Sequence, residues 1–283
     1  VAVGLQQLGI TSGFIGKVGD DAFGRFLTKT LFDKGVDISS VLYSDEARTG
    51  LAFVSLKADG DREFMFYRHP SADMLLRPEE IDEDAIQSAK LLHFGSISLI
   101  DEPVRSATLH AINTAMNAGC LISYDPNLRP ALWPHLEAAK AGLLLGLSKA
   151  NIVKISEEEI EFLTGISDLR EACESLWHDK LQLIVVTEGS KGCYYFTPEF
   201  QGSLDSFKVK AIDATGAGDG FVAGLLQGLL KNPDTINNQN HLAELCRFAN
   251  AVGAIATTER GGIPALPDLE SVQRFMNANS SLN

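Results

Sequence analysis

The sequence predicts an α/β fold, a three-layer α/β/α sandwich around a mostly parallel central sheet. Short apolar runs predict buried strands at residues 91–94, 121–124, 152–155 and 183–187. Longer amphipathic segments between these runs, such as residues 104–118 and 157–163, predict helices. This alternation is typical of β-α-β units, in which helices cover both faces of a parallel sheet and ligands bind at the carboxyl ends of the strands.

A different pattern precedes these units. Residues 50–56 and 63–67 alternate between apolar and polar side chains, and Asp59, Gly60 and Asp61 lie between them. Two alternating strands joined by a short Asp-Gly turn predict a β hairpin.

Length and composition restrict the class of protein. A chain of 283 residues that is 45% hydrophobic can form one large core without a second domain. The net charge of −13 argues against binding to nucleic acid or to an acidic membrane, since no basic stripe is present. A phosphate-bearing ligand would therefore need local donors and a metal ion.

The four cysteines are widely spaced and form no C-x-x-C pair, so the sequence predicts neither a zinc site nor a disulfide framework. No apolar run approaches the roughly 20 residues that span a bilayer, and no signal peptide is visible. We therefore expect a cytoplasmic protein with no membrane partner.

The most informative segment is a glycine-rich bend before an apolar helix. Gly216, Ala217 and Gly218 carry little or no side chain, and Asp219 follows them directly. Backbone N–H groups in such a bend can converge on an anion, helped by the positive end of the helix dipole. The Asp219 carboxylate could cap the helix or could accept a proton from a substrate hydroxyl. Three tiny residues in succession favour the second interpretation, because they cost backbone entropy unless something approaches the main chain closely.

The bend matches neither of two common nucleotide-binding motifs. A Walker A loop needs Gly-Lys followed by Ser or Thr, and a dinucleotide fingerprint needs a third glycine where Phe221 stands. A dehydrogenase is therefore disfavoured.

The chain resembles the ribokinase-like (PfkB) carbohydrate kinase family, and within it most the plant-type fructokinases. The motifs that carry the resemblance follow the family's order at residues 16–24 (GKVGDDAFG), 66–74 (FYRHPSADM), 93–98 (HFGSIS), 123–129 (SYDPNLR), 185–192 (VVTEGSKG), 213–219 (DATGAGD) and 248–251 (FANA). In the family, a further strand and a sugar-contacting Gly-Gly…Asn motif precede the position of Val1, and this sequence does not contain them. The resemblance implies a ribokinase-like core at residues 1–47 and 72–283 and makes the hairpin part of a lid at residues 48–71.

The resemblance also implies the reaction. The expected activity is transfer of the γ-phosphoryl group of ATP to a sugar hydroxyl, with D-fructose giving fructose 6-phosphate. Asp219 would act as the base, the Gly216–Gly218 bend as the anion hole, and Arg129 would neutralise charge on the phosphate. Arg68 would reach the sugar. Ribose, nucleosides and 2-keto-3-deoxygluconate remain alternative acceptors, and a non-catalytic sugar or nucleotide sensor remains an alternative function.

Further residues are assigned to ligands through the resemblance. The expected ATP-binding residues are Lys154, Thr187, Gly189, Gly192, Gly218 and Asn250. Glu159 would bind Mg²⁺ through water, in an Asn-x-x-Glu element whose Asn position is held here by Ser156. Asp213 and Thr215 would bind a monovalent cation, which implies dependence on K⁺. Dimerisation through the lid is common in the family, and the sequence leaves it open.

Simpler structural roles compete with each of these assignments. Arg68 could be a solvated surface residue. Asp125, Asn127 and Arg129 follow a buried strand at the end where ligands bind, but a strand followed by Asp-Pro-Asn could also be an ordinary turn. Ser156 and Glu159 fit a capping box. Residues 187–192 could be a plain hairpin turn. Small residues beside Asn250, such as Ala249 and Gly253, could serve close packing of helices.

Overall fold

A computed structural model of the chain describes residues 1–56 and 62–279. Its centre is a six-stranded sheet with the strand order β10-β9-β8-β7-β6-β5, in which β5 to β8 are parallel and β9 pairs antiparallel with both β8 and β10. The strands are β5 (Leu91–Gly95), β6 (Leu121–Asp125), β7 (Ile152–Ser156), β8 (Leu183–Thr187), β9 (Gly192–Phe196) and β10 (Gln201–Asp205). The four strands predicted from apolar runs and the mostly parallel sheet are confirmed.

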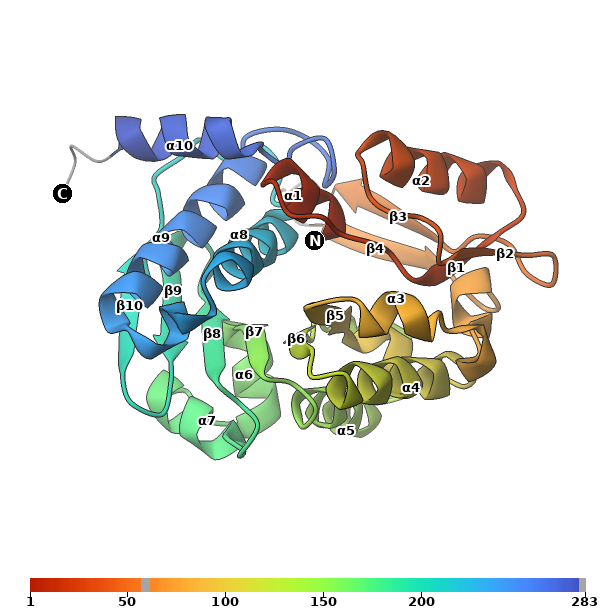
Figure 1. The fold of residues 1–283 in the computed structure, drawn as a ribbon, viewed down its shortest axis with the longest axis horizontal. Helices are drawn as coiled ribbons and strands as arrows, with labels where there is room; N and C mark the ends of the chain where they lie inside the picture. Colours follow the sequence, from red (N-terminus) through yellow and green to blue (C-terminus); the bar gives the residue numbers. More distant parts are fainter. Residues whose placement is uncertain (57–61, 280–283) are drawn as a thin grey trace.

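Helices cover both faces of this sheet (Figure 1). One layer contains α4 (Val104–Asn117), α5 (Leu136–Leu147), α6 (Glu157–Thr164) and α7 (Leu169–Leu176), and the other contains α8 (Ala217–Lys231) and α9 (Gln239–Ala256). Strand β8 shows the division, because successive side chains of a strand point to opposite faces. Ile184 and Val186 pack with the α5–α7 layer, whereas Leu183 and Val185 pack with α8 and α9. The predicted three-layer sandwich is confirmed.

The amino-terminal part adds α1 (Ala2–Gln7), α2 (Ala22–Asp33), β1 (Gly16–Gly19) and β2 (Val41–Ser44), and α3 (Glu83–Gln87) and α10 (Leu269–Ala278) complete the helices. Strands β1 and β2 form their own parallel pair, separate from the six-stranded sheet. Short 3₁₀ helices lie at Ala72–Leu75, Pro78–Glu80, Ser96–Leu99, Pro130–Leu132, Gly189–Lys191 and Pro233–Asn237. No helix in the described ranges is long and apolar enough to cross a membrane.

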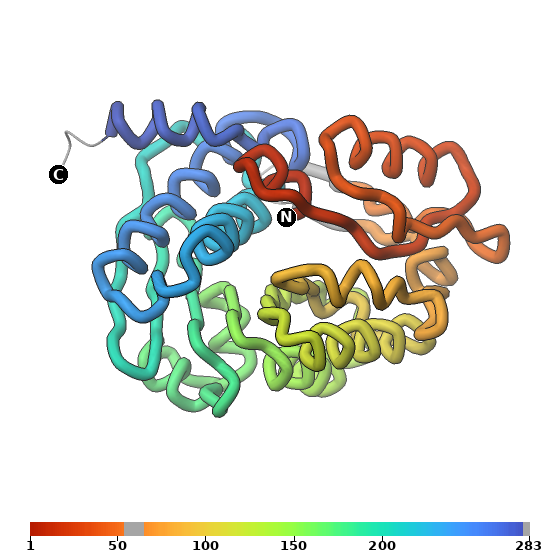
Figure 2. Tube along the Cα trace, viewed as in Figure 1, coloured from red at the N-terminus to blue at the C-terminus, as the bar shows by residue number. Residues whose placement is uncertain are grey.

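Strands β3 (Leu51–Leu56) and β4 (Arg62–Tyr67) form an antiparallel pair with Leu51 opposite Tyr67. The predicted hairpin strands are therefore confirmed, while the predicted turn at residues 59–61 lies outside the described residues. The pair lies on the same side of the molecule as α2, β1 and β2, as the red and orange segments of Figure 2 show.

Asp21 fixes α2 to the chain that leads into β3. Its carboxylate caps α2 by accepting from the Gly24 N–H at 2.8 Å, and it also accepts from the Thr49 N–H at 2.9 Å and the Thr49 hydroxyl at 2.8 Å. These hydrogen bonds to Thr49 and Gly24 lower the pKa of Asp21 to about 2. The acidic motif at residues 16–24 thus has a structural role in this fold.

Helices α8 and α9 pack closely because α8 has a glycine at every fourth position of one face. A Cβ added to Gly224 would lie 2.9 Å from the Cα of Ala249, and one added to Gly228 would lie 2.2 Å from Leu245 Cδ1. A Cβ at Gly220 would meet no atom closer than 3.4 Å. Small residues therefore do allow these helices to approach, as the sequence suggested.

We expect Gly224→Ala to destabilise the fold by about 1–3 kcal/mol, because the new methyl group meets backbone that cannot move away without separating the helices. Gly220→Ala is the matched control on the same helix. It should be neutral or stabilising by up to about 1 kcal/mol through helix propensity. Urea unfolding of both variants checks the prediction, and equal stability of the two would contradict it.

Candidate active site

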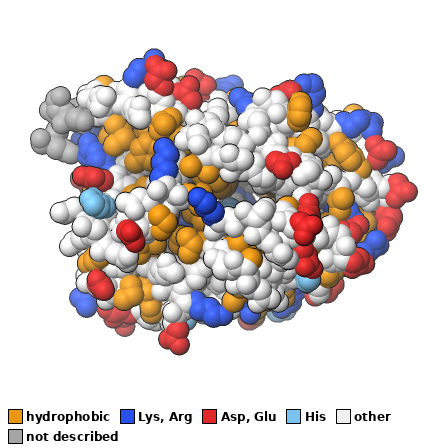
Figure 3. Space-filling model, in the orientation of Figure 1, with side chains coloured by type: hydrophobic (Ala, Val, Ile, Leu, Met, Phe, Trp, Pro, Cys, Tyr) orange, Lys and Arg blue, Asp and Glu red, His pale blue; other side chains and the backbone are white. Residues whose placement is uncertain are grey.

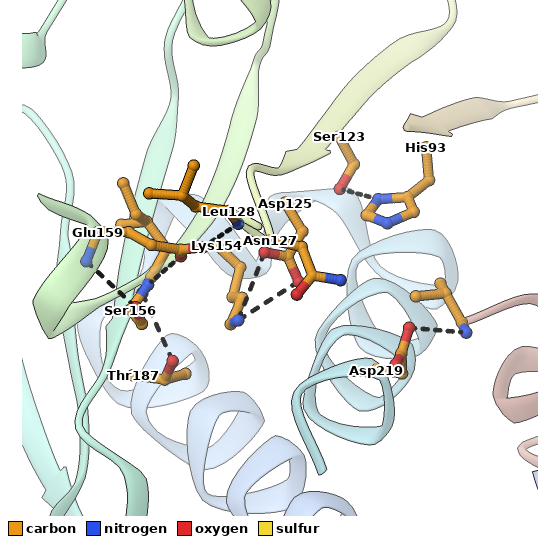
Figure 4. A network of polar contacts seen from close by, with 12 residues as sticks. His93, Ser123, Asp125, Asn127, Leu128, Lys154, Ser156, Glu159, Thr187 and Asp219 are labelled. Carbon is orange, nitrogen blue, oxygen red and sulfur yellow. Dashed lines mark hydrogen bonds and ion pairs between the residues drawn. The ribbon is translucent and has the colours of Figure 1, made fainter. Parts of the chain in front are cut away.

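Polar side chains meet at the carboxyl ends of β6 and β7, beside the amino end of α8 (Figure 4). A cavity of about 360 Å³ opens there, lined by Asn127, Leu128, Arg129, Pro130, Lys154, Ser156, Glu158 and Glu159. A second cavity of about 440 Å³ lies between α5 and α7, next to the segments that lead into β7 and β8, and contains none of the predicted site residues. The carboxyl ends of parallel strands are where ligands bind in such sheets, so we place the candidate site at the first cavity.

The glycine-rich bend forms the amino end of α8. Gly216 is the N-cap residue with φ of 82°, a left-handed conformation that favours glycine, and a Cβ there would lie 2.9 Å from Gly262 Cα. The Ala217 N–H donates to Ala214 O at 3.2 Å. A Cβ on Gly218 would lie 3.4 Å from Lys154 Nζ. Since the first N–H groups of a helix have no intrahelical acceptor, this small-residue bend can receive an anion next to a lysine.

Asp219 is the third residue of α8, and its carboxylate is open to solvent. Its side chain is 51% exposed, and Oδ1 lies 3.5 Å from the α-amino group of Val1. The cap position is occupied by Gly216, and α8 has no side-chain cap. The alternative that Asp219 serves as the helix cap is therefore wrong.

The loop before the bend is shaped by Asp213. One carboxylate oxygen accepts from the Thr215 N–H and the other from the Gly261 N–H, both at 2.9 Å. These bonds hold the 213–216 segment against the loop that contains Gly261 and Gly262. The assignment of Asp213 and Thr215 to a monovalent cation stays a prediction.

Lys154 and Asp125 form a buried ion pair in the middle of the site. Lys154 Nζ lies 3.4 Å and 3.3 Å from the two carboxylate oxygens of Asp125, and the residues are 9% and 7% exposed. Burial raises the pKa of Asp125 to about 6, although the adjacent Lys154 cation opposes the shift. The Asp125 carboxyl group is therefore mostly ionised at neutral pH, in a place where charge needs a partner.

His93 and Ser123 form a second polar pair on β5 and β6. His93 Nδ1 lies 3.0 Å from Ser123 Oγ. Burial lowers the pKa of His93 to about 4, so its imidazole is neutral at pH 7. Figure 4 shows this pair on the side of the site nearest Asp219.

Ser156 and Glu159 form the predicted capping box at the start of α6. The Ser156 hydroxyl accepts from the Glu159 N–H at 3.2 Å, and Glu159 Oε2 accepts from the Ser156 N–H at 2.9 Å. Glu159 Oε1 also accepts from the Leu128 N–H at 2.6 Å. A carboxylate oxygen has lone pairs for more than one donor, so Glu159 could also accept a hydrogen bond from a metal-bound water.

Arg129 and Asn127 form part of the cavity wall. Arg129 Nη1 donates to Leu128 O at 2.9 Å, which folds the guanidinium back toward its own loop. Asn127 has φ of 46°, in the left-handed region that Asn tolerates better than most residues. This loop thus turns sharply after β6 and directs its polar groups to the cavity.

The segment with Thr187, Gly189 and Gly192 joins β8 to β9 as a hairpin, which confirms the simpler of its two interpretations. Gly192 is explained by packing, because a Cβ there would lie 1.9 Å from Leu204 O. Gly189, with φ of 59°, would meet nothing within 4 Å. Asn250 is buried on α9, where Nδ2 lies 3.5 Å from Cys193 Sγ. Contacts of these residues with a nucleotide remain predictions.

Arg68 follows β4 and is 7% exposed, so its interpretation as a solvated surface residue is wrong. Its Nε and an Nη both lie 2.7 Å from Asp73 Oδ2. The ion pair holds Arg68 at the base of the hairpin, in a part of the chain that is separate from the 360 Å³ cavity wall.

Two residues of the polar network received no assigned role from the sequence: His93 was not considered individually, and Asp125 was considered at the ligand-binding end of its strand, with an ordinary turn as the alternative. Both lie in strands that are otherwise apolar. Charged or titratable side chains in strands covered on both faces are uncommon, and that contrast is the signal that could have identified them. Among the described residues, no group of three or more His, Cys, Asp and Glu side chains could hold a metal ion by itself.

Comparison with known proteins gives a consistent result. The model of the family described as "pfkB family carbohydrate kinase" matches residues 1–269. A probable fructokinase-4 from Arabidopsis thaliana is 50% identical over 280 residues, which cover 99% of this chain and 86% of that protein. The structure of a fructokinase from Xylella fastidiosa with bound ATP is similar with a TM-score of 0.93 and 34% identity, covering 99% of this chain and 89% of that one. A fructokinase from Vibrio cholerae O395 with fructose, ADP and calcium has a TM-score of 0.86 and 37% identity, covering 97% and 88%.

We expect His93 to reduce stability in acid. Its pKa is about 4 in the folded protein and about 6.5 when unfolded. Between these values the unfolded chain binds more protons, so the His93 contribution falls as the pH drops, by up to about 1.4 kcal/mol per pH unit.

In the His93→Gln variant this contribution is absent. The difference in unfolding free energy between wild type and variant should therefore shift against the wild type from pH 7 to pH 4.5, as measured by urea unfolding at each pH. Titration of other groups occurs in both proteins and cancels. A difference that stays constant across this range would contradict the lowered pKa.

Proposed function

Because the chain belongs to the pfkB family of carbohydrate kinases, we propose that it transfers the γ-phosphoryl group of ATP to D-fructose, giving fructose 6-phosphate. The named relatives are fructokinases, and one of the similar structures holds fructose. The observation that carries the proposal is the open glycine bend, with an exposed carboxylate at the amino end of α8 and a lysine beside it.

In this proposal Asp219 accepts the proton of the sugar hydroxyl as that oxygen attacks the γ-phosphorus in line. Asp219 suits a base because its carboxylate is exposed and is not used as a cap. The bend at Gly216, Ala217 and Gly218 directs main-chain N–H groups and the helix dipole at the phosphoryl oxygens. Phosphoryl transfer needs mainly positioning and charge stabilisation, which this arrangement supplies.

The cavity next to the bend would hold the phosphates of the nucleotide. Lys154 and Arg129 line it as cations, and Glu159 lies where its carboxylate can hold a metal-bound water. Mg²⁺ would neutralise charge on the phosphate oxygens. Thr187, Gly189, Gly192 and Asn250 would contact the rest of the nucleotide, and Asp213 and Thr215 would bind K⁺ beside the bend.

The hairpin of β3 and β4, within residues 48–71, would act as a lid on the core formed by residues 1–47 and 72–283. Arg68 supports this role because it lies at the base of the hairpin, fixed by Asp73, where it could contact the sugar. In the orientation of Figure 1, the space-filling view in Figure 3 shows hydrophobic side chains around the middle of the visible face and most charged side chains toward its edges.

An assay of ADP formation with a panel of acceptors tests the function. D-fructose should give the highest kcat/KM among D-fructose, D-ribose, adenosine and 2-keto-3-deoxygluconate. A higher kcat/KM for another acceptor would identify the protein as a kinase of that acceptor instead. ATP binding by calorimetry with no ADP formed from any of these acceptors would instead indicate a sensor.

Asp219→Asn should lower kcat by roughly 10²–10⁴-fold, as expected for loss of a general base, because the amide cannot accept the hydroxyl proton. The affinity for ATP, measured by calorimetry, should change little. Asp33→Asn, an exposed carboxylate at the end of α2, is the control and should leave kcat unchanged. An Asp219→Asn variant with full activity would remove this residue from the role of base.

The outer face of the hairpin supports a homodimer. Phe53, Met65 and Tyr67 are 56%, 58% and 60% exposed, and the Phe53 and Tyr67 rings contact each other at 5.5 Å. Apolar side chains gathered on one exposed face are typical of interaction surfaces. Phe53→Asp should therefore give a 30.6 kDa monomer in sedimentation velocity, whereas Phe32→Asp on α2 should stay dimeric. A monomeric wild type would exclude the dimer.

A further inference from the structure

The ion pair of Lys154 and Asp125 joins two neighbouring strands at the carboxyl edge of the sheet. Lys154 lies on β7 and Asp125 is the last residue of β6. Both carboxylate oxygens of Asp125 face the ammonium, at 3.3 Å and 3.4 Å. The two side chains are about one-tenth exposed, so the contact is shielded from solvent. Removing one partner of such a pair leaves an uncompensated buried charge.

The ammonium of Lys154 also lies against the amino end of α8. A Cβ on Gly218 would be 3.4 Å from Nζ, which places the cation beside the second residue of the helix. The amino end of a helix carries a partial positive charge, so a lysine there is repelled unless an anion balances it. In the described part of the chain, Asp125 is the anion that contacts this lysine.

Lys154 and Asp125 differ in their relation to the cavity. Lys154 is part of the cavity wall, together with Arg129 and Glu159, whereas Asp125 is not. Figure 4 shows the Asp125 carboxylate directed at the lysine ammonium. A ligand in the cavity would therefore meet the lysine, and the effect of the aspartate on that ligand would pass through the lysine.

We propose that Asp125 is a positioning residue for Lys154, holding its ammonium next to Gly218 so that it meets the γ-phosphoryl group of the nucleotide. This inference rests on the proposed function, since it assigns a role within the same transfer. Without Asp125, the ammonium loses the anion that holds it beside the helix end. With it, two sources of positive charge, the lysine and the first amides of α8, converge on one anion.

Steady-state kinetics of Asp125→Asn, Lys154→Met and the double variant test whether Asp125 acts through Lys154. Each single variant should lower kcat/KM for ATP by about 100-fold, the usual cost of one donor to developing charge. The KM for the sugar should stay unchanged. The double variant should be no worse than Lys154→Met alone, because residues that act as one unit are not additive.

Two kinetic results would overturn the proposal. If the losses multiply in the double variant, Asp125 acts independently of Lys154. If Asp125→Asn raises the KM for the sugar and leaves that for ATP unchanged, Asp125 contacts the acceptor instead.

A matched variant separates positioning from stability. Lys17 and Glu80 form another largely buried ion pair, on β1 and the 3₁₀ helix at residues 78–80, away from the cavity. Glu80→Gln should lower the unfolding free energy with no change in kcat/KM for ATP. Asp125→Asn should lower both. If Asp125→Asn changes only the unfolding free energy, as Glu80→Gln does, the positioning role is wrong.

Binding measurements keep the test independent of turnover. Calorimetry should show that wild type prefers a non-hydrolysable ATP analogue to ADP and that Asp125→Asn loses this preference while still binding ADP. If the wild type forms no ADP from any sugar but this loss is seen, the proposed function fails and the positioning role stands. An unchanged preference for the triphosphate analogue in Asp125→Asn would overturn the positioning role.

Discussion

The close approach of α8 to the carboxyl ends of β6 and β7 is the constraint on which the site depends. At Gly218 the helix comes so close to Lys154 that an added Cβ would lie in van der Waals contact with the ammonium, at 3.4 Å. The close approach requires the glycines farther along α8, which let α9 pack against it and hold the helix in place. Small residues thus allow close packing farther along α8, and at its amino end they form the bend that the proposed anion recognition needs.

Charge in this region is balanced locally. The chain carries a net charge of −13, which repels phosphates at long range. Local positive charge at the site comes from Lys154 and Arg129 on the cavity wall and from the positive end of α8. A buried lysine beside that helix end would be unfavourable alone, and Asp125 offsets the repulsion. Positive charge is therefore concentrated at a few contacts, in opposition to the field of the whole molecule.

Much of this arrangement could be predicted from sequence, since hydrophobic periodicity determines which segments are strands and helices. The runs at residues 91–94 and 183–187 became β5 and β8, and the Ser156–Glu159 spacing gave the observed capping box. The partners of individual side chains were harder to predict from the sequence. Arg68 was compatible with an exposed residue until Asp73 was seen beside it, and Asp125 was compatible with a turn until its lysine was found across the sheet. The Asp125–Lys154 pair joins neighbouring strands 29 residues apart in sequence, and the Arg68–Asp73 pair depends on how the chain folds after β4. Local patterns encode neither pair.

His93 and Asp125 have pKa values displaced in opposite directions, one downward to about 4 and the other upward to about 6. Mild acid therefore favours the unfolded chain through the imidazole and the folded chain through the carboxyl group over nearly the same interval. The contributions of the two groups to the free energy of unfolding have opposite signs and offset each other. Between pH 6 and 4 the net effect of these two groups on the free energy of unfolding is therefore small, although the charge of Asp125 changes.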